Sequence, residues 1–307
     1  MDLHQPHDQF FKAIMQDKAM ATDYIKSFLP LSITQNIDFS SLVLEDKSYI
    51  DELLKSTFSD IVYSCKVKNV DENFEIAILL EHKSYIDIQV TFQLLYYISS
   101  TWMKKIANNE KPILIVPVLF YHGKEKWEYQ TITTLFSNLP NELKQYIPNF
   151  EYIFNNLQSL SDQDIRALQN QFLSANFLAL KHYFDRFWLK ENIVELFSKL
   201  LTENKNLKTQ FIVYVLNFVQ LTNEEQIKVI EKVSSNQKKE IMNAIESWKK
   251  EGIEIGMKKG IEKGIKQNTI DVIKASFKNG ISIELIANIT NMDEKSVLEI
   301  LKEHQLI

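Results

Sequence analysis

The sequence predicts an α/β fold in its first half and an entirely helical second half. Residues 61–67 and 74–80 are rich in β-forming side chains and are separated by a short polar stretch, which favours two paired strands. Residues 88–107 carry apolar side chains at helical spacing. All six prolines fall between residues 6 and 148, whereas long helical patterns dominate the rest of the chain.

The predicted elements follow one another in a definite order. Apolar residues recur at helical spacing over 7–29 and stop at Pro30, which predicts a first helix. The two strands should form an antiparallel hairpin with its turn near Asp71, and the helix at 88–107 follows them. An apolar run over 112–123, bounded by Pro and Gly, predicts the next strand. Helix, strands, helix and strand is the core order of the restriction-endonuclease-like fold.

Three charged residues are expected to converge at the end of this hairpin. Antiparallel pairing about the polar turn brings Asp60 opposite residues 81–83. Side chains alternate across a strand, so Glu81 and Lys83 share one face while His82 points to the other. A buried acid and a buried lysine are costly unless they are paired or coordinate an ion.

These residues have the chemistry of a metal-dependent nuclease of the PD-(D/E)xK type. The carboxylates of Asp60 and Glu81 and a main-chain carbonyl, that of His82, are hard oxygen ligands of the kind Mg²⁺ accepts. Such an ion lowers the pKa of a bound water and stabilises the charge that builds on a phosphodiester. Lys83 would orient the water or neutralise the phosphate. Taken alone, a Glu-x-Lys pair at a strand end is more often a solvated ion pair.

Several sequence blocks resemble one known family. HDQFFKAI near the start, FSDIVYS, LLEHKS with the later Asp87, FQLLYY followed by Trp102, and PILIVPVLFYHGKEKW occur in this order. Together they resemble the Rpn family of recombination-promoting nucleases, also called YhgA-like, over residues 4 to about 220. The resemblance implies a PD-(D/E)xK core, DNA cleavage assisted by Mg²⁺ or Ca²⁺, and a role in recombination or in mobile-element and phage biology.

Carried across by position, the resemblance assigns roles to four residues. Asp60 and Glu81 would be metal ligands, and Lys83 the catalytic lysine. Asp8 would lie on the first helix, where relatives of this fold place another acid facing the metal. An acid at that position also caps free N–H groups and favours the helix dipole, and this explanation of Asp8 is equally good.

Gln89, Gln93 and Tyr97 form a polar stripe at intervals of four on the helix after the acid-x-lysine strand. From this position Gln93 is expected to reach the metal-bound water or the phosphate. Gln93 and Tyr97 also resemble the Gln-x-x-x-Tyr motif of RecB-type nucleases, which makes both candidate catalytic residues. The alternative is a solvated face with a tyrosine that serves only packing.

Composition indicates a soluble cytoplasmic enzyme without an organic cofactor. The single cysteine, Cys65, excludes an internal disulfide framework, and the scattered His residues do not suggest zinc. The polar first residues do not form a signal peptide, and no apolar stretch approaches membrane-helix length. With a net charge of −5, any DNA contact needs a local basic patch. Candidates for that patch are Lys104, Lys105, Lys111, Lys124 and Lys126.

We expect three regions: a nuclease core over 1–150, a helical layer over 151–247 and a helical tail over 248–307. Four glycines recur every fourth residue at the start of the tail, and small residues at this spacing let two helices approach closely. We therefore expect a homo-oligomer formed through this helix; a frayed linker is the alternative. These glycines are Gly252, Gly256, Gly260 and Gly264.

The end of the tail is expected to form short helices, with Gly280 at a C-cap and Ser282 and Asp293 as N-caps. This pattern resembles a helix-turn-helix, but the acidic start of its last helix is a poor surface for phosphates. A packing or dimerising module is therefore the favoured interpretation.

Three functions from different classes account for the sequence. They are a metal-dependent DNA endonuclease using Mg²⁺, or else Ca²⁺ or Mn²⁺, a degenerate nuclease fold that binds DNA without cutting it, and an oligomeric interaction protein. The intact set of Asp60, Glu81 and Lys83 favours the first. A cut-and-paste transposase is disfavoured, because no second set of acids at the required spacing stands out.

Overall fold

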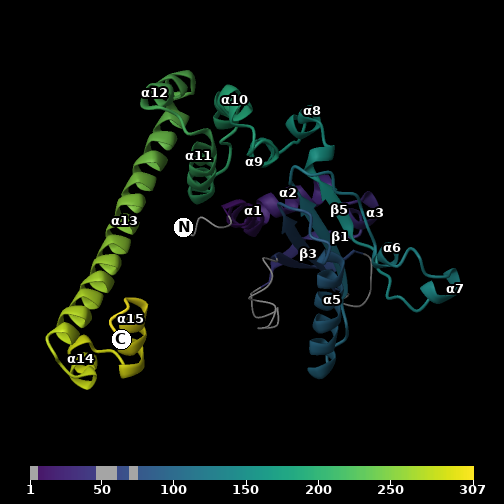
Figure 1. The fold of residues 1–307 in the computed structure, drawn as a ribbon. Helices are drawn as coiled ribbons and strands as arrows, with labels where there is room; N and C mark the ends of the chain where they lie inside the picture. Colours follow the sequence, from purple (N-terminus) through teal and green to yellow (C-terminus); the bar gives the residue numbers. More distant parts are fainter. Residues whose placement is uncertain (1–5, 46–60, 69–74) are drawn as a thin grey trace. The chain divides into compact units, whose positions relative to one another are not determined.

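The computed structural model describes residues 6–45, 61–68 and 75–307. A five-stranded mixed sheet in the order β1-β2-β3-β4-β5 forms the centre of the first part of the chain (Figure 1). β1, β2 and β3 pair antiparallel, whereas β3, β4 and β5 pair parallel. The strands are β1 (Ile37–Leu44), β2 (Ile61–Val67), β3 (Glu75–Lys83), β4 (Leu114–Tyr121) and β5 (Ile153–Asn156).

Helices cover both faces of this sheet. α5 (Val90–Ala107) packs on one face through Val90, Leu94 and Tyr97, which join a buried cluster with strand residues. α1 (Pro6–Gln16) and α2 (Lys18–Phe28) lie on the other face, where the Tyr63 hydroxyl donates to the carbonyl of Met15 at 2.8 Å. The two faces therefore have different chemistry, because residues alternate between them along each strand.

The first predicted helix is two helices. Asp17 ends the run of α1 and caps α2, since its Oδ1 accepts from the N–H groups of Ala19 and Met20. The predicted hairpin is found as β2 and β3, with Ile61 paired to Leu80. The predicted helix at 88–107 and the strand after it are found as α5 and β4. The strand β5 lies inside a range that was expected to be wholly helical.

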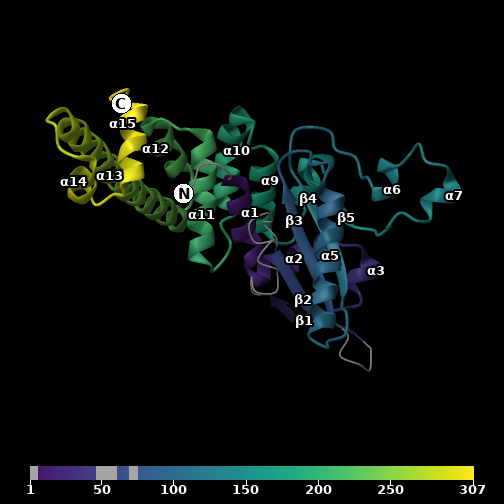
Figure 2. The same cartoon turned by 60° about the horizontal axis from the view of Figure 1, so that its bottom comes forward.

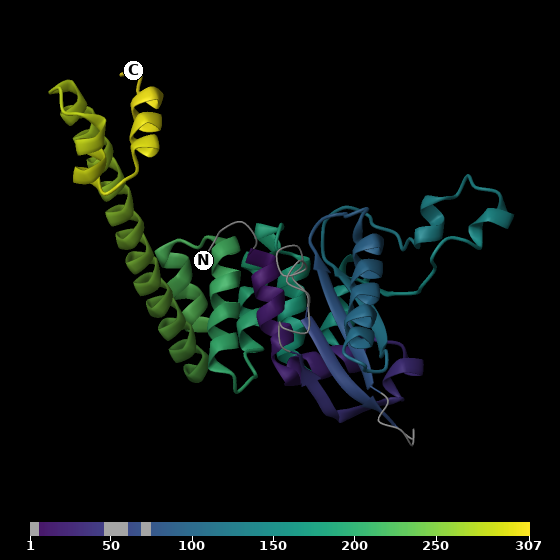
Figure 3. The same cartoon turned by 90° about the horizontal axis from the view of Figure 1, so that it is seen from below.

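A helical layer lies beyond α1 and α2, on the side away from α5 (Figure 3). Within it α11 packs against α1, and α9 against α2. A long excursion that carries α6 and α7 connects β4 to β5 (Figure 2). The remaining elements up to α12 are α3 (Leu31–Thr34), α6 (Ile132–Leu135), α7 (Asn141–Lys144), η2 (Leu157–Ser159), α8 (Asp162–Arg166), α9 (Gln171–Lys181), α10 (Arg186–Ser198), α11 (Lys205–Val219) and α12 (Asn223–Lys232).

The chain divides into two compact units, one up to Met242 and one from Asn243 to Ile307. The long helix α13 (Ser235–Lys278) leads into α14 (Ile283–Thr290) and α15 (Glu294–Glu303), and these form a separate core around Ile273, Ile286, Val297 and Leu301. Gly280 has a φ of +79°, and Ser282 and Asp293 cap the last two helices as predicted. Among the described residues, no helix is long and apolar enough to cross a membrane.

Candidate active site

Glu81 and Lys83 lie at the carboxyl end of β3 with their side chains on the α5 face. Both residues are buried, with exposed fractions of 3% and 8%. The Lys83 ammonium Nζ lies 3.0 Å from Oε1 of Glu81. The alternation of side chains along a strand predicted that Glu81 and Lys83 share a face. The alternative was a solvated ion pair, and the structure shows a buried ion pair.

Two further side chains from the start of α5 meet the same ammonium group. Nζ of Lys83 lies 2.8 Å from Oδ2 of Asp87 and donates to Oε1 of Gln93 at 3.1 Å. The Gln93 amide in turn donates to Oδ2 of Asp87 at 3.3 Å. The structure therefore brings the predicted residues Glu81, Lys83 and Gln93 together and adds Asp87 to them.

Asp87 was not among the candidate site residues predicted from the sequence. Its Oδ1 accepts from the N–H of Gln89 at 2.9 Å, so it also orders the turn that leads into α5. The available signal was its position four residues after Lys83 and just before the predicted helix. Capping explains an acid at such a position, which is why the sequence alone did not identify it as a site residue.

The charges at this site stabilise one another. Burial alone would lower the pKa of Lys83, but the charge of Glu81 and the hydrogen bonds to Asp87 and Glu81 outweigh it and raise the pKa. Partial burial would raise the pKa of the Asp87 carboxyl, but the hydrogen bonds from Lys83 and Gln89 lower it. Lys83 and Asp87 are therefore both charged at neutral pH.

One oxygen of Glu81 fits a metal ligand. Oε2 is buried and has no hydrogen-bond partner within residues 6–45, 61–68 and 75–307. Such an oxygen is costly to bury unless something satisfies it, and a divalent cation would do so. Within those same ranges no three His, Cys, Asp or Glu side chains gather as a metal-ligand group. The second predicted carboxylate, Asp60, lies outside the described residues.

Asp8 approaches β3 from the opposite face. Its Oδ1 lies 3.4 Å from Nδ1 of His82, and its Oδ2 lies 3.7 Å from Nζ of Lys12. The ring of His82 points away from Glu81, as the strand alternation predicted. The structure thus places Asp8 beside the His82 ring. A metal-ligand role for the main-chain oxygen of His82 stays a prediction.

The His82 ring belongs to a buried histidine cluster. Its Nε2 lies 3.0 Å from Nδ1 of His122, which is fully buried at the end of β4, and His122 also donates its main-chain N–H to the carbonyl of Lys83. Nδ1 of His7 lies 2.8 Å from the hydroxyl of Tyr214 on α11. Burial, with the neighbouring His82, lowers the pKa of His7 to about 4 and that of His122 well below its ordinary value. Both rings are therefore neutral at pH 7.

The remaining predicted site residues are dispersed. Tyr97 is buried in the cluster between α5 and the sheet, one turn beyond Gln93. In the predicted basic patch, Lys105 pairs with Glu110 at 2.7 Å and Lys126 with Glu128 at 2.6 Å. Lys124 lies over the ring of Phe184.

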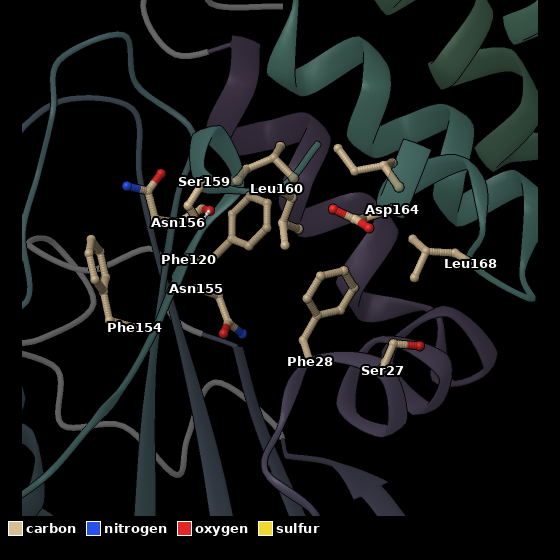
Figure 4. Close-up of a pocket in the computed structure, with 12 residues that line it drawn as sticks. Ser27, Phe28, Phe120, Phe154, Asn155, Asn156, Ser159, Leu160, Asp164 and Leu168 are labelled. Atoms are coloured by element: carbon tan, nitrogen blue, oxygen red, sulfur yellow. Dashed lines mark hydrogen bonds between the residues drawn. The ribbon is translucent and has the colours of Figure 1, made fainter. Parts of the chain in front are cut away.

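A separate cavity of about 430 Å³ lies on the face opposite to Glu81. Figure 4 shows Phe120 and Asn155 of the sheet on one side of it, with Phe28 and Asp164 on the other. None of the predicted site residues that the structure describes lines this cavity. Because Phe120 pairs in register with His82, its ring occupies the His82 face, and the cavity does not open onto the Glu81–Lys83 pair.

Comparison with known proteins gives a consistent picture. The family model described as "Putative transposase, YhgA-like" matches residues 5–211. Recombination-promoting nuclease RpnD of Escherichia coli O157:H7 is 30% identical over 225 residues, which cover 72% of this chain and 83% of the relative. Inactive recombination-promoting nuclease-like protein RpnE of E. coli K12 is 24% identical over 95% of this chain and 96% of the relative. Recombination-promoting nuclease RpnC of the same strain is 31% identical over 39% of each chain. No solved structure matches.

Proposed function

This chain belongs to the YhgA-like family, and from that membership we propose that it is a metal-dependent DNA endonuclease with a PD-(D/E)xK core. The relatives named as recombination-promoting nucleases support a nuclease that acts in recombination. The order of helices and strands around the sheet is compatible with such a core. We place the biological role in recombination or in mobile-element and phage biology.

The observation that carries the proposal is the surroundings of Lys83. A buried lysine held by two acids and an amide, next to a carboxylate oxygen with no partner among the described residues, is an expensive arrangement for a purely structural ion pair. Replacing such a pair by apolar residues is often neutral or stabilising, so stability alone does not account for it. A site that binds a cation and a phosphate does account for it.

The proposed ligands of the cation are Asp60, Glu81 and the main-chain carbonyl of His82, with Mg²⁺ as the expected ion and Ca²⁺ or Mn²⁺ as alternatives. When bound, the cation supplies a more acidic water and charge stabilisation at the scissile phosphate. Lys83, at 3.0 Å from Glu81, is placed to neutralise a phosphate oxygen or to orient the attacking water. Gln93 holds the ammonium of Lys83 and can reach the same water or phosphate.

A catalytically inactive member of the fold is the second candidate. RpnE, which matches almost the whole length of this chain, carries the word inactive in its name. A chain of this kind would use the same surface to bind DNA, or would act as an oligomeric interaction protein. The retained Glu81 and Lys83 favour the enzyme.

Self-association through α13 is part of the proposal. Four large apolar side chains on this helix are 60–63% exposed, and a Cβ built at any of the four glycines meets nothing within 4 Å among the described residues. Glycines at this spacing allow a second helix to approach closely. The apolar residues are Ile253, Met257, Ile261 and Ile265.

Nicking of supercoiled plasmid tests the enzyme. Purified wild type is compared with Asp60→Ala and Lys83→Ala in Mg²⁺, Mn²⁺, Ca²⁺ or EDTA, with Glu240→Gln as a control far from the site. We expect metal-dependent nicking that both site variants lose and the control keeps. No nicking by folded wild type in any metal favours the inactive alternative, whereas nicking that survives both site substitutions overturns the site.

A further inference from the structure

Asp87 links the end of β3 to the start of α5. One carboxylate oxygen, Oδ2, contacts Nζ of Lys83 at 2.8 Å and the amide nitrogen of Gln93 at 3.3 Å. The other, Oδ1, accepts from the main-chain N–H of Gln89 at 2.9 Å. The side chain is only 13% exposed. Both oxygens are thus fixed, and the carboxylate has one orientation.

The three acceptors around Lys83 match its three donors. An ammonium group has three N–H bonds and no acceptor, and Glu81, Asp87 and Gln93 each supply one oxygen within 3.1 Å. In this state Lys83 is the positive charge that balances Glu81. A divalent cation on Oε2 of Glu81 would weaken the contact between Lys83 and Oε1 of the same carboxylate, because two cations at such distances repel each other.

We propose that Asp87 is a positioning residue that holds Lys83 at the site when Glu81 releases it to bind a divalent cation. This inference rests on the proposed function. With Glu81 engaged elsewhere, Asp87 and Gln93 still hold two of the three N–H groups of Lys83. The third is then available to a phosphate or a water.

Removing the Asp87 charge should therefore impair cation binding through Lys83. Asp87→Asn keeps an oxygen for the Gln89 N–H, so the start of α5 is preserved. Lys83 then depends more strongly on Glu81 and competes better with the cation. We expect the affinity for Ca²⁺ to fall about 10–100-fold, the usual size of the effect when a group just outside the metal ligands is lost. Gln93→Met, which removes an acceptor without changing charge, should act in the same direction.

A double-mutant cycle followed by calorimetric Ca²⁺ titration separates this effect from simple loss of charge. Lys83→Met alone should tighten Ca²⁺ binding, because it removes the competitor. In that background Asp87→Asn should have a clearly smaller effect than in the wild type. An equal effect in both backgrounds would mean that Asp87 acts on the cation directly, and the proposal would be wrong.

A second measurement needs no metal. Reductive methylation of the full chain, read by peptide mass spectrometry, reports which lysines are shielded by their contacts. In a Glu81→Ala background, where Glu81 no longer holds Lys83, Asp87→Asn should remove the remaining protection of Lys83 and leave Lys208 unchanged. Glu240→Gln should expose Lys208, its partner at 2.7 Å, and leave Lys83 unchanged. If wild type binds none of Mg²⁺, Mn²⁺ and Ca²⁺ in the same titration, the proposed function fails and the methylation result still decides the role of Asp87. Unchanged protection of Lys83 overturns that role.

Discussion

Nε2 of His82 and Nδ1 of His122 lie 3.0 Å apart, so two buried rings on neighbouring parallel strands share one hydrogen bond. The same His122 donates its main-chain N–H to the carbonyl of Lys83 at 3.2 Å. The end of β3 is thus fixed from the face opposite to the one that carries Glu81 and Lys83. Side chains on the face opposite to Glu81 and Lys83 therefore help to fix the end of the strand that carries the candidate active site.

His122→Ala should destabilise the protein strongly. The substitution leaves a cavity where a fully buried ring stood and leaves Nε2 of His82 without its partner. We expect the free energy of unfolding to fall by about 3 kcal/mol. Urea denaturation measures it, with the exposed Lys126→Ala as a control that should change it by no more than about 0.5 kcal/mol. A loss similar to that of the control would show that the cluster does not hold β3.

The histidine cluster should make stability fall in mild acid. The pKa of His7 is about 4 in the folded chain but about 6.5 in an unfolded one. Below pH 6.5 the unfolded chain therefore takes up a proton that the folded chain does not, which favours unfolding; above it, neither binds one. His122 acts in the same direction.

The size of this effect can be measured with His7→Phe. Between pH 6.5 and 5 the wild type should lose about 1 kcal/mol more unfolding free energy than the His7→Phe variant. This is about half of what the full pKa shift would give, because His7 is partly exposed and solvent screens its charge. Paired aspartates lose their contribution only below about pH 4, outside this window. Urea unfolding at pH 7.5 and 5 gives the comparison, and parallel losses in both proteins would contradict the prediction.

A divalent cation should stabilise the wild type through Glu81. At a Ca²⁺ concentration about 100 times its dissociation constant, the gain in unfolding free energy is about 2.7 kcal/mol. Glu81→Gln should abolish the gain, because it removes the negative charge of the carboxylate whose Oε2 has no partner in the described part of the chain. Unfolding in Ca²⁺ and in EDTA tests this. Asp8→Asn decides between the two roles left open for Asp8: a retained gain leaves it as an acid that favours the first turn of α1, and a lost gain makes it a metal ligand.

The parts of the site that follow from local pattern were predictable. Strand alternation placed Glu81 and Lys83 together and turned His82 away from them. Helical spacing placed Gln93 on the polar stripe expected to face the site, although its hydrogen bond from Lys83 was not predicted. These relationships span few residues, so the sequence contains them directly. The family resemblance from the sequence is confirmed by the match over residues 5–211.

The relationships that were missed depend on contacts between distant segments. From the sequence only the main chain of His82 received a role. The partner of its ring, His122, lies at the end of β4, forty positions later in the chain, and no local pattern connects the two residues. β5 is four half-buried residues long, too short for alternation to be recognised in a helical region. The break in the first predicted helix at Asp17 was also missed. The apolar spacing continues across Asp17, but its side chain caps the start of α2.

The glycines of α13 give the last prediction, in which stability and association should change in opposite directions. In a helix that packs against nothing, Gly→Ala at 256 and 260 should stabilise it by about 1 kcal/mol each. If a second copy packs on this face, the added methyl groups should keep the helices apart and weaken the association at least about tenfold, which corresponds to about 1.4 kcal/mol.

Sedimentation equilibrium of the full chain measures this association, with Lys258→Ala on the same helix as a matched control. Weaker self-association in the glycine variant alone identifies the glycines as part of an interface. A stabilised helix with an unchanged association constant would mean that the glycines do not lie at the interface. A closely packed contact surface would not tolerate two added methyl groups.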